Sequence, residues 1–148
     1  MANLAKIKIF QRDCCRYATG AKVSLLDGNE NVIASHRIGD VSNESWFEIN
    51  VSDFSPEVAA VKIEHDQQSH YMTLSEVEVY ETVGSGLVNI AMNMTATQSS
   101  SPYLDYPADR GNDGDTATFF STDQELGKSH TYTQNFHSNT AVLTIFSL

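Results

Sequence analysis

The sequence lacks the features of membrane-spanning, disordered and basic proteins. No apolar run approaches the roughly 20 residues that a membrane-spanning helix needs. Apolar residues make up 41% of the 148 residues, which is typical of a globular domain rather than a disordered chain. Positive charge is scarce, because 9 Lys and Arg stand against 19 Asp and Glu. Nucleic acid and anionic membranes attract basic surfaces, so we expect neither nucleic acid nor membrane lipid as a partner.

Motifs of catalysis are also missing. The chain has no nucleophile elbow, no phosphate-binding loop and no His-Glu-x-x-His sequence. No two histidines have metal-ligand spacing on one element, and the only cysteines are adjacent, so a zinc site is not expected. Asp and Glu are plentiful, so counting alone leaves a glycosidase carboxylate pair open. We expect a protein that is not an enzyme.

A secretory leader is missing from the start of the chain, where Met1-Ala2-Asn3 has neither a basic start nor an apolar core. Three tripeptides fit the N-glycosylation pattern: Asn43-Glu44-Ser45, Asn50-Val51-Ser52 and Asn93-Met94-Thr95. They favour an extracellular or cell-surface location, in which case the leader is absent from this sequence.

No segment of the sequence has the apolar periodicity of a helix; instead, apolar and polar residues alternate along much of the chain. Six segments alternate with period two, as half-buried strands do: 6–9, 21–25, 46–51, 61–64, 76–79 and 141–145. Turn sequences such as Asp27-Gly28-Asn29 and Asp113-Gly114-Asp115 separate them. The length predicts one domain, and many short strands at this spacing predict an antiparallel sandwich or barrel.

Composition changes at residues 81–87, where Gly84-Ser85-Gly86 indicates a short flexible connector. Beyond it the chain is more polar, and we expect loops to dominate from Asp109 to Asn139. Trp46, the single tryptophan, heads a predicted strand, where core or rim packing is expected.

The adjacent pair Cys14-Cys15 is the most unusual local feature. A bond between neighbours would close a small ring and give a rigid turn with an apolar sulfur face, with little effect on chain entropy. Two reduced thiols in a turn fit the spacing equally well.

Several motifs together resemble F-type lectin (fucolectin) domains of the discoidin-like, coagulation-factor C-type superfamily. Ile7 to Cys15 followed by Gly20 to Asp27 is similar to the middle strands of that family, and Leu74 to Tyr80 to its last strand. Asn89 to Asn93 followed by Ala96 to Ser100 resembles its opening, and Asn112 to Asp115 resembles the calcium loop that follows the opening. The resemblance implies an all-β, antiparallel jelly-roll β-sandwich, discoidin or galactose-binding-like, of eight strands or a similar number.

The order of these motifs is circularly permuted. Residues 1–82 match the C-terminal half of the family and residues 88–148 its N-terminal half, with 83–87 as the joint. A cut from a tandem array would give the same order; we favour a permuted single domain, because domains tolerate permutation when their termini lie close together. Strand 143–146 is then expected beside strand 5–10, in a monomer or a strand-exchanged dimer.

The resemblance implies a Ca²⁺ site. Its ligands would be the side chain of Asp113 and the carboxylate of Glu76, with main-chain or hydroxyl oxygens completing the shell. Those oxygens would come from Arg110, Asp115, Ser75 and one of Ser121 or Thr122.

The resemblance also implies a sugar site in which a histidine and two arginines surround a disulfide between the adjacent cysteines. At the two arginine positions this chain has Gln11 and Ala18, so fucose specificity does not carry over. The candidates for ligand contact are Gln11, Arg12, Cys14, Cys15, Arg16, Tyr17, His130 and His70.

The expected function is therefore a calcium-stabilised, non-catalytic, glycan-binding module. The alternative is a protein-adhesion or scaffolding module that keeps the fold and has lost sugar binding. The lectin family's fold, not its sugar, is what the motifs imply most directly.

Overall fold

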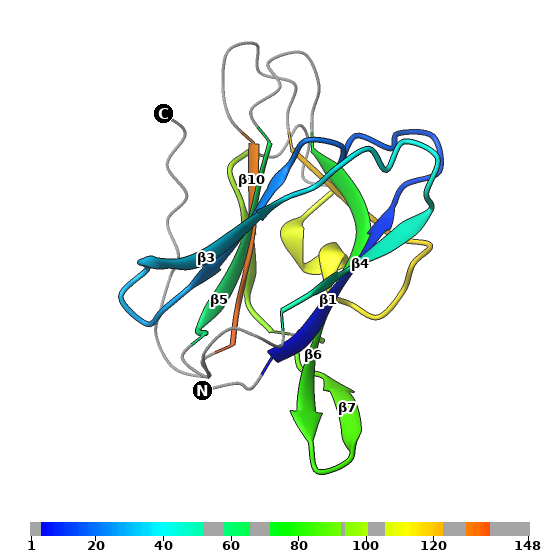
Figure 1. Cartoon of the computed structure of the whole chain (residues 1–148). Helices are drawn as coiled ribbons and strands as arrows, with labels where there is room; N and C mark the ends of the chain where they lie inside the picture. The colour runs from blue at the N-terminus through cyan, green and yellow to red at the C-terminus, as the bar shows by residue number, and fades with distance from the viewer. Residues whose placement is uncertain are drawn as a thin grey trace.

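The computed structural model describes residues 4–51, 58–65, 72–92, 94–100, 106–122 and 130–136. Within these ranges the chain forms ten strands and one short 3₁₀ helix, and all strand pairs are antiparallel. No helix in the described ranges has the length and apolar character needed to cross a membrane. The predicted all-β sandwich is confirmed, since the strands form two sheets that face each other (Figure 1).

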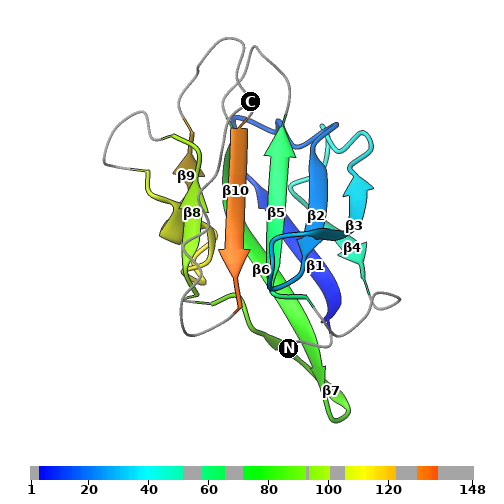
Figure 2. The ribbon, with the colours of Figure 1, turned by 90° about the vertical axis from the view of Figure 1, so that its left-hand side faces the viewer.

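The first sheet has the order β4, β1, β6 and β7, with β9 also paired to β6. Its strands are β1 (Leu4–Gln11), β4 (Trp46–Asn50), β6 (Thr73–Val83), β7 (Gly86–Asn89) and β9 (Phe120–Ser121). The second sheet has the order β3, β2, β5, β10 and β8 (Figure 2). Its strands are β2 (Lys22–Leu26), β3 (Val32–Arg37), β5 (Ala60–His65), β8 (Ala96–Gln98) and β10 (His130–Asn135).

Alternating apolar side chains from both sheets build the core. On the first sheet Ile7 and Ile9 lie directly opposite Val79 and Val77 of β6, and all four are fully buried. The polar partners in these strands point outward, as period two requires. The second sheet contributes Val23, Leu25, Val61, Ile63 and Tyr132.

Strand β6 lacks a neighbouring strand on one side between its pairings with β9 and β7, and side-chain amides complete that edge. The buried amide nitrogen of Gln134 donates to the carbonyl oxygen of Val77 at 2.9 Å. The amide oxygen of Asn89 accepts from the N–H of Val79 at 3.1 Å. Backbone groups without a strand partner are thus satisfied inside the sandwich.

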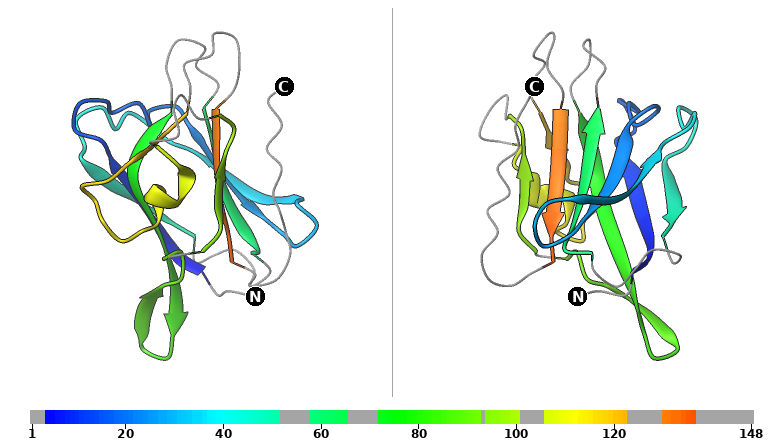
Figure 3. Two further views of the ribbon diagram at one scale, coloured as in Figure 1. Left: turned by 180° about the vertical axis from the view of Figure 1, so that it is seen from behind. Right: turned by 60° about the vertical axis from the view of Figure 1, so that its left-hand side comes forward.

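The predicted flexible connector at residues 81–87 is instead part of a β-hairpin. Glu81 pairs with Val88 and Thr82 with Leu87, so β6 and β7 are joined by a two-residue turn at Gly84-Ser85. The φ of +60° at Gly84 suits such a turn. Figure 3 shows this hairpin projecting beyond the rest of the sandwich.

The prediction that loops dominate 109–139 was wrong at β9 and β10. Strand β10 has the sequence His-Thr-Tyr-Thr-Gln-Asn, which carries no apolar alternation because residues on both of its faces are polar. Its threonines and tyrosine favour strands, and the pairing with β5 and β8 fixes it centrally in the sheet. The predicted strand 141–145 and its expected pairing with 5–10 lie outside the described residues.

Candidate functional site

A pocket of about 480 Å³ opens where β1 ends, beside the adjacent cysteines. Aromatic, polar and charged side chains dominate its lining, which comes from four segments: Phe10, Gln11, Arg12, Asp13, Cys14, Ser45, Trp46, Ser75, Thr116, Ala117 and Phe119. A concave surface of this mixed character and size suits a small polar ligand.

The floor of this pocket is formed by a tight turn after β1. The N–H of Cys15 donates to the carbonyl of Arg12 at 3.0 Å, and a disulfide joins Cys14 to Cys15. Cys14 and Cys15 are therefore bonded to each other in the structure and are not two reduced thiols. Cys14 is exposed at the pocket, whereas Cys15 is 8% exposed and belongs to the core.

The two positions at which the resembling family has arginine both face the protein interior. Gln11 is buried, and its amide nitrogen donates to the carbonyls of Val41 and Glu44 at 2.8 and 2.7 Å. Its amide oxygen accepts from the N–H of Ala18 at 3.2 Å. Gln11 therefore fixes the loop that carries Ser45, and it acts as a structural residue of the pocket wall.

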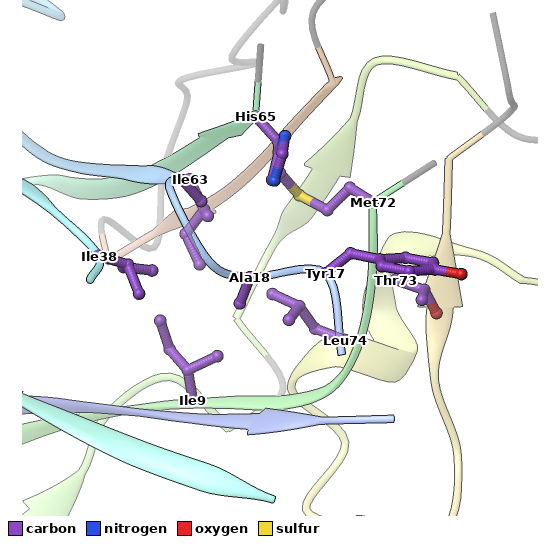
Figure 4. Close-up of a pocket in the computed structure, with 10 residues that line it drawn as sticks. Ile9, Tyr17, Ala18, Ile38, Ile63, His65, Met72, Thr73 and Leu74 are labelled. Carbon is purple, nitrogen blue, oxygen red and sulfur yellow. The ribbon is translucent and has the colours of Figure 1, made fainter. Parts of the chain in front are cut away.

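Ala18 lines a second, much smaller pocket between the sheets, of about 10 Å³. Figure 4 shows Ala18 among Ile9, Ile38, Ile63 and Leu74, with His65 and Tyr17 at the rim. This space is too small and too apolar for a sugar. An arginine at position 18 would have to leave it, so this wall differs from that of the resembling family.

The other predicted sugar contacts are dispersed. The guanidinium of Arg16 lies 3.6 Å from the carboxylate of Asp13, and Tyr17 lines the small pocket, so neither lines the larger one. His130 begins β10 opposite His65, on the second sheet. His70 lies outside the described residues.

Trp46 lies at the rim, as predicted, but it is not hidden by packing. Its side chain is 45% exposed, and its ring centroid is 6.4 Å from that of Phe10. Both rings line the larger pocket, as does Phe119. The exposed face of an indole suits the apolar face of a sugar, so we count Trp46 among the site residues.

Oxygen atoms converge in the loop between the 3₁₀ helix (Ala108–Gly111) and β9. The hydroxyl of Thr118 lies 2.8 Å from Oδ2 of Asp113, 2.9 Å from the carbonyl oxygen of Asp115 and 3.4 Å from that of Arg110. A hydroxyl has a single proton and can donate to one of these three at a time. The structure therefore brings together three of the predicted calcium ligands, around a residue that the sequence reasoning missed.

Glu76 reaches this loop from β6. Its fully buried carboxylate accepts through Oε1 from the N–H of Gly114 at 3.1 Å, and Oε2 has no hydrogen-bond partner in the part of the chain that the structure describes. Burial, followed by the nearby carboxylates of Asp113 and Glu78, raises the pKa of Glu76 to about 7, against the lowering effect of the Gly114 hydrogen bond. An unpaired buried carboxylate oxygen is costly unless a proton or a cation neutralises it.

Two further residues were predicted as calcium ligands: Ser75 lies next to Glu76, whereas the Ser121 hydroxyl bonds away from the loop cluster. The pairing of β1 with β6 skips Ser75, since Phe10 opposes Glu76 and Gln11 opposes Leu74, so Ser75 is the extra residue of a bulge next to Glu76. Ser121 lies on β9, and its hydroxyl donates to the carbonyl of Thr122 rather than to the loop cluster.

The described part of the chain holds no cluster of three or more His, Cys, Asp and Glu side chains. A cation at the loop cluster would therefore depend on carbonyl and hydroxyl oxygens besides Asp113 and Glu76, which is chemistry that calcium accepts. Comparison of the chain with protein-family models, with curated proteins and with solved structures finds no match.

Proposed function

We propose that this chain is a calcium-stabilised, non-catalytic carbohydrate-binding module that works at the cell surface or outside the cell. The observation that carries the proposal is the pocket of about 480 Å³, in which the Cys14–Cys15 disulfide, aromatic rings and polar groups meet. Sugars need both an apolar platform and hydrogen-bonding groups. The disulfide is also the kind of bond that persists outside the cytosol.

The calcium part of the proposal rests on the orphaned Oε2 of Glu76 and on the three oxygens around Thr118. Glu76, Asp113 and the carbonyls of Arg110 and Asp115 would hold the ion, with the Ser75 carbonyl at the bulge available to it. A bound Ca²⁺ supplies charge neutralisation and rigid cross-linking. Without an ion, the hydrogen bond from the N–H of Gly114 to Glu76 already ties the loop that carries Thr116 and Phe119 to strand β6.

We further propose that the sandwich is a permuted jelly roll. The β6–β7 hairpin supports this, because it places the segment that resembles the family's last strand directly beside the segment before its opening motif. Either a monomer or a strand-exchanged dimer would satisfy the same pairings, and the mass from light scattering at several dilutions distinguishes them.

A second candidate function is protein adhesion or scaffolding without sugar binding. It is favoured by the inward orientation of Gln11 and Ala18, since the family's two arginines have no counterparts that face the pocket. The exposed Trp46 beside a free pocket favours the first candidate, because a scaffold that has lost its ligand does not need such a ring.

A glycan array probed in the presence of calcium tests the proposal. We expect binding to a restricted set of glycans that is lost in the variant Trp46→Ala. The variant Val32→Ala, which alters another exposed apolar side chain on β3 of the second sheet, is the control and should bind normally. Absence of binding to every glycan by the folded wild-type protein would favour the adhesion module instead.

A further inference from the structure

Arg12 is a cation in the larger pocket, and the described residues provide no acidic partner for it. Its guanidinium lies 3.7 Å from the centroid of the Phe119 ring. None of the carboxylates in the described residues lies within 4.0 Å of it. A guanidinium stacked on a ring keeps the N–H groups of its edge available, and their fork matches the oxygens of a carboxylate or sulfate.

A second cation lies on the aromatic rim of the same pocket. The Nζ of Lys8 is 4.1 Å from the ring centroid of Trp46 and 4.8 Å from that of Phe10. Lys8 and Phe10 share the outward face of β1, and Arg12 is the residue directly after the end of that strand. Lys8 likewise has no carboxylate within 4.0 Å among the described side chains.

The acidic groups nearest to this row have partners elsewhere. Glu48, opposite Lys8 on β4, bonds to Lys6 at 2.8 Å. Glu78, opposite Lys8 on β6, accepts from the hydroxyl of Tyr80 at 2.8 Å. Asp13 lines the pocket, but its carboxylate is 3.6 Å from Arg16. In a chain of net charge -10, Arg12 is a cation that lines this pocket, and Lys8 lies over two of the rings that line it.

We infer that the ligand of this pocket is an anionic saccharide, one that carries a carboxylate or a sulfate group. The inference rests on the proposed carbohydrate-binding function and specifies its ligand class. Arg12 binds the anionic group through its exposed fork, Lys8 adds positive potential at the rim, and the Trp46 ring packs on the apolar face of the sugar. The loss of the two family arginines thereby changes the ligand class rather than abolishing binding.

Titration calorimetry with matched sugars tests this inference in calcium-containing buffer. Galactose and glucose are each compared as the neutral sugar, the uronic acid and the 6-sulfate, which separates carboxylate from sulfate recognition. We expect at least one charged form to bind about tenfold or more tightly than its neutral parent. Raising the salt from about 50 to about 500 mM shortens the Debye length roughly threefold and should reduce this preference.

Variants of Arg12 then test whether this residue causes the preference for charged over neutral sugars. Arg12→Ala should remove it, and Arg12→Lys, which keeps the charge but not the fork, should keep only part of it. Arg37→Ala removes the same charge from β3 on the second sheet and should leave it intact. The inference is overturned if neutral and charged sugars bind equally well, or if Arg12→Ala keeps the preference. In those cases the proposed function stands; if no sugar binds here or on the glycan array, both fail.

Discussion

The carboxylate of Glu76 on β6 accepts a hydrogen bond from the backbone N–H of Gly114, 38 residues further along the chain, at 3.1 Å. This contact joins the first sheet to the acidic loop. The second oxygen of Glu76 is buried without a partner, and Asp113 lies close enough to raise the pKa of Glu76. The junction is therefore short of positive charge, which a proton or the proposed calcium ion would supply.

Calcium should raise the melting temperature of the protein. A ligand that binds only the native state adds about 2.7 kcal/mol at a hundredfold excess over its dissociation constant. For a domain of this size that is roughly 5–10 °C. Scanning calorimetry in excess calcium and in EDTA measures the difference. Asp113→Asn should abolish it, whereas Asp27→Asn, in an acidic turn elsewhere, should keep it. Superimposable curves for the wild type would rule out the ion.

The pH dependence without calcium should carry the signature of Glu76. The pKa of this group is raised from 4.5 to about 7 in the folded state, so the folded protein binds the proton more tightly than the unfolded chain. Its contribution to stability is full below about pH 4.5 and is lost as the pH rises through 7, by on the order of 2–3 kcal/mol.

Urea unfolding in EDTA between pH 4.5 and 8 measures this loss. The variant Glu76→Gln, which resembles the protonated acid, should lack this part of the pH dependence. A wild type and a Glu76→Gln variant with parallel stability profiles would contradict the assignment.

Gly111 should tolerate no side chain. A Cβ at this position would lie 2.8 Å from the ring of Phe120 and 2.8 Å from the hydroxyl of Tyr132, two buried rings that are stacked with centroids 4.3 Å apart. Gly111→Ala should therefore lower the free energy of unfolding by about 1–3 kcal/mol. Gly28→Ala is the control, because nothing lies within 4 Å of the added Cβ. Equal stability of the two variants in urea would show that the loop does not pack as described.

The disulfide should matter for binding more than for stability. The bond between Cys14 and Cys15 closes the smallest possible loop, so its effect on the entropy of the unfolded chain is small. The double variant Cys14→Ser, Cys15→Ser should melt within a few degrees of the wild type but bind glycans more weakly, because the turn at the pocket floor loosens. Unchanged glycan affinity would remove the disulfide from the site.

The sequence predicted the fold where one face of a strand is apolar and the other polar. Strands β1, β2, β4, β5 and β6 follow that rule. Strand β10 could not be predicted in this way, because Gln134 and Thr133 are buried polar residues on opposite faces of it. Their burial follows from tertiary contacts, such as the bond of Gln134 to Val77, that leave no trace in local periodicity.

The candidate site was predictable only in its outline. The adjacent cysteines, Asp113 and Glu76 were visible as motifs, but Thr118 depends on the path of a loop that sequence spacing does not determine. Trp46 illustrates a different limit. An aromatic residue at the start of a strand can lie on either side of the chain, and one residue of register decides between core and pocket.

The most direct test of the account is an amide NMR titration of the calcium-loaded protein with a saccharide that binds it. Carbohydrate binding in the Cys14 pocket predicts shift changes concentrated at Phe10–Cys14, Ser45–Trp46, Ser75 and Thr116–Phe119, the segments that line the pocket. Strand β3 and the end of the β6–β7 hairpin from Glu81 to Val88, which do not line it, should remain unchanged. Saturable binding that shifts those elements and leaves the pocket segments unperturbed would contradict the central claim.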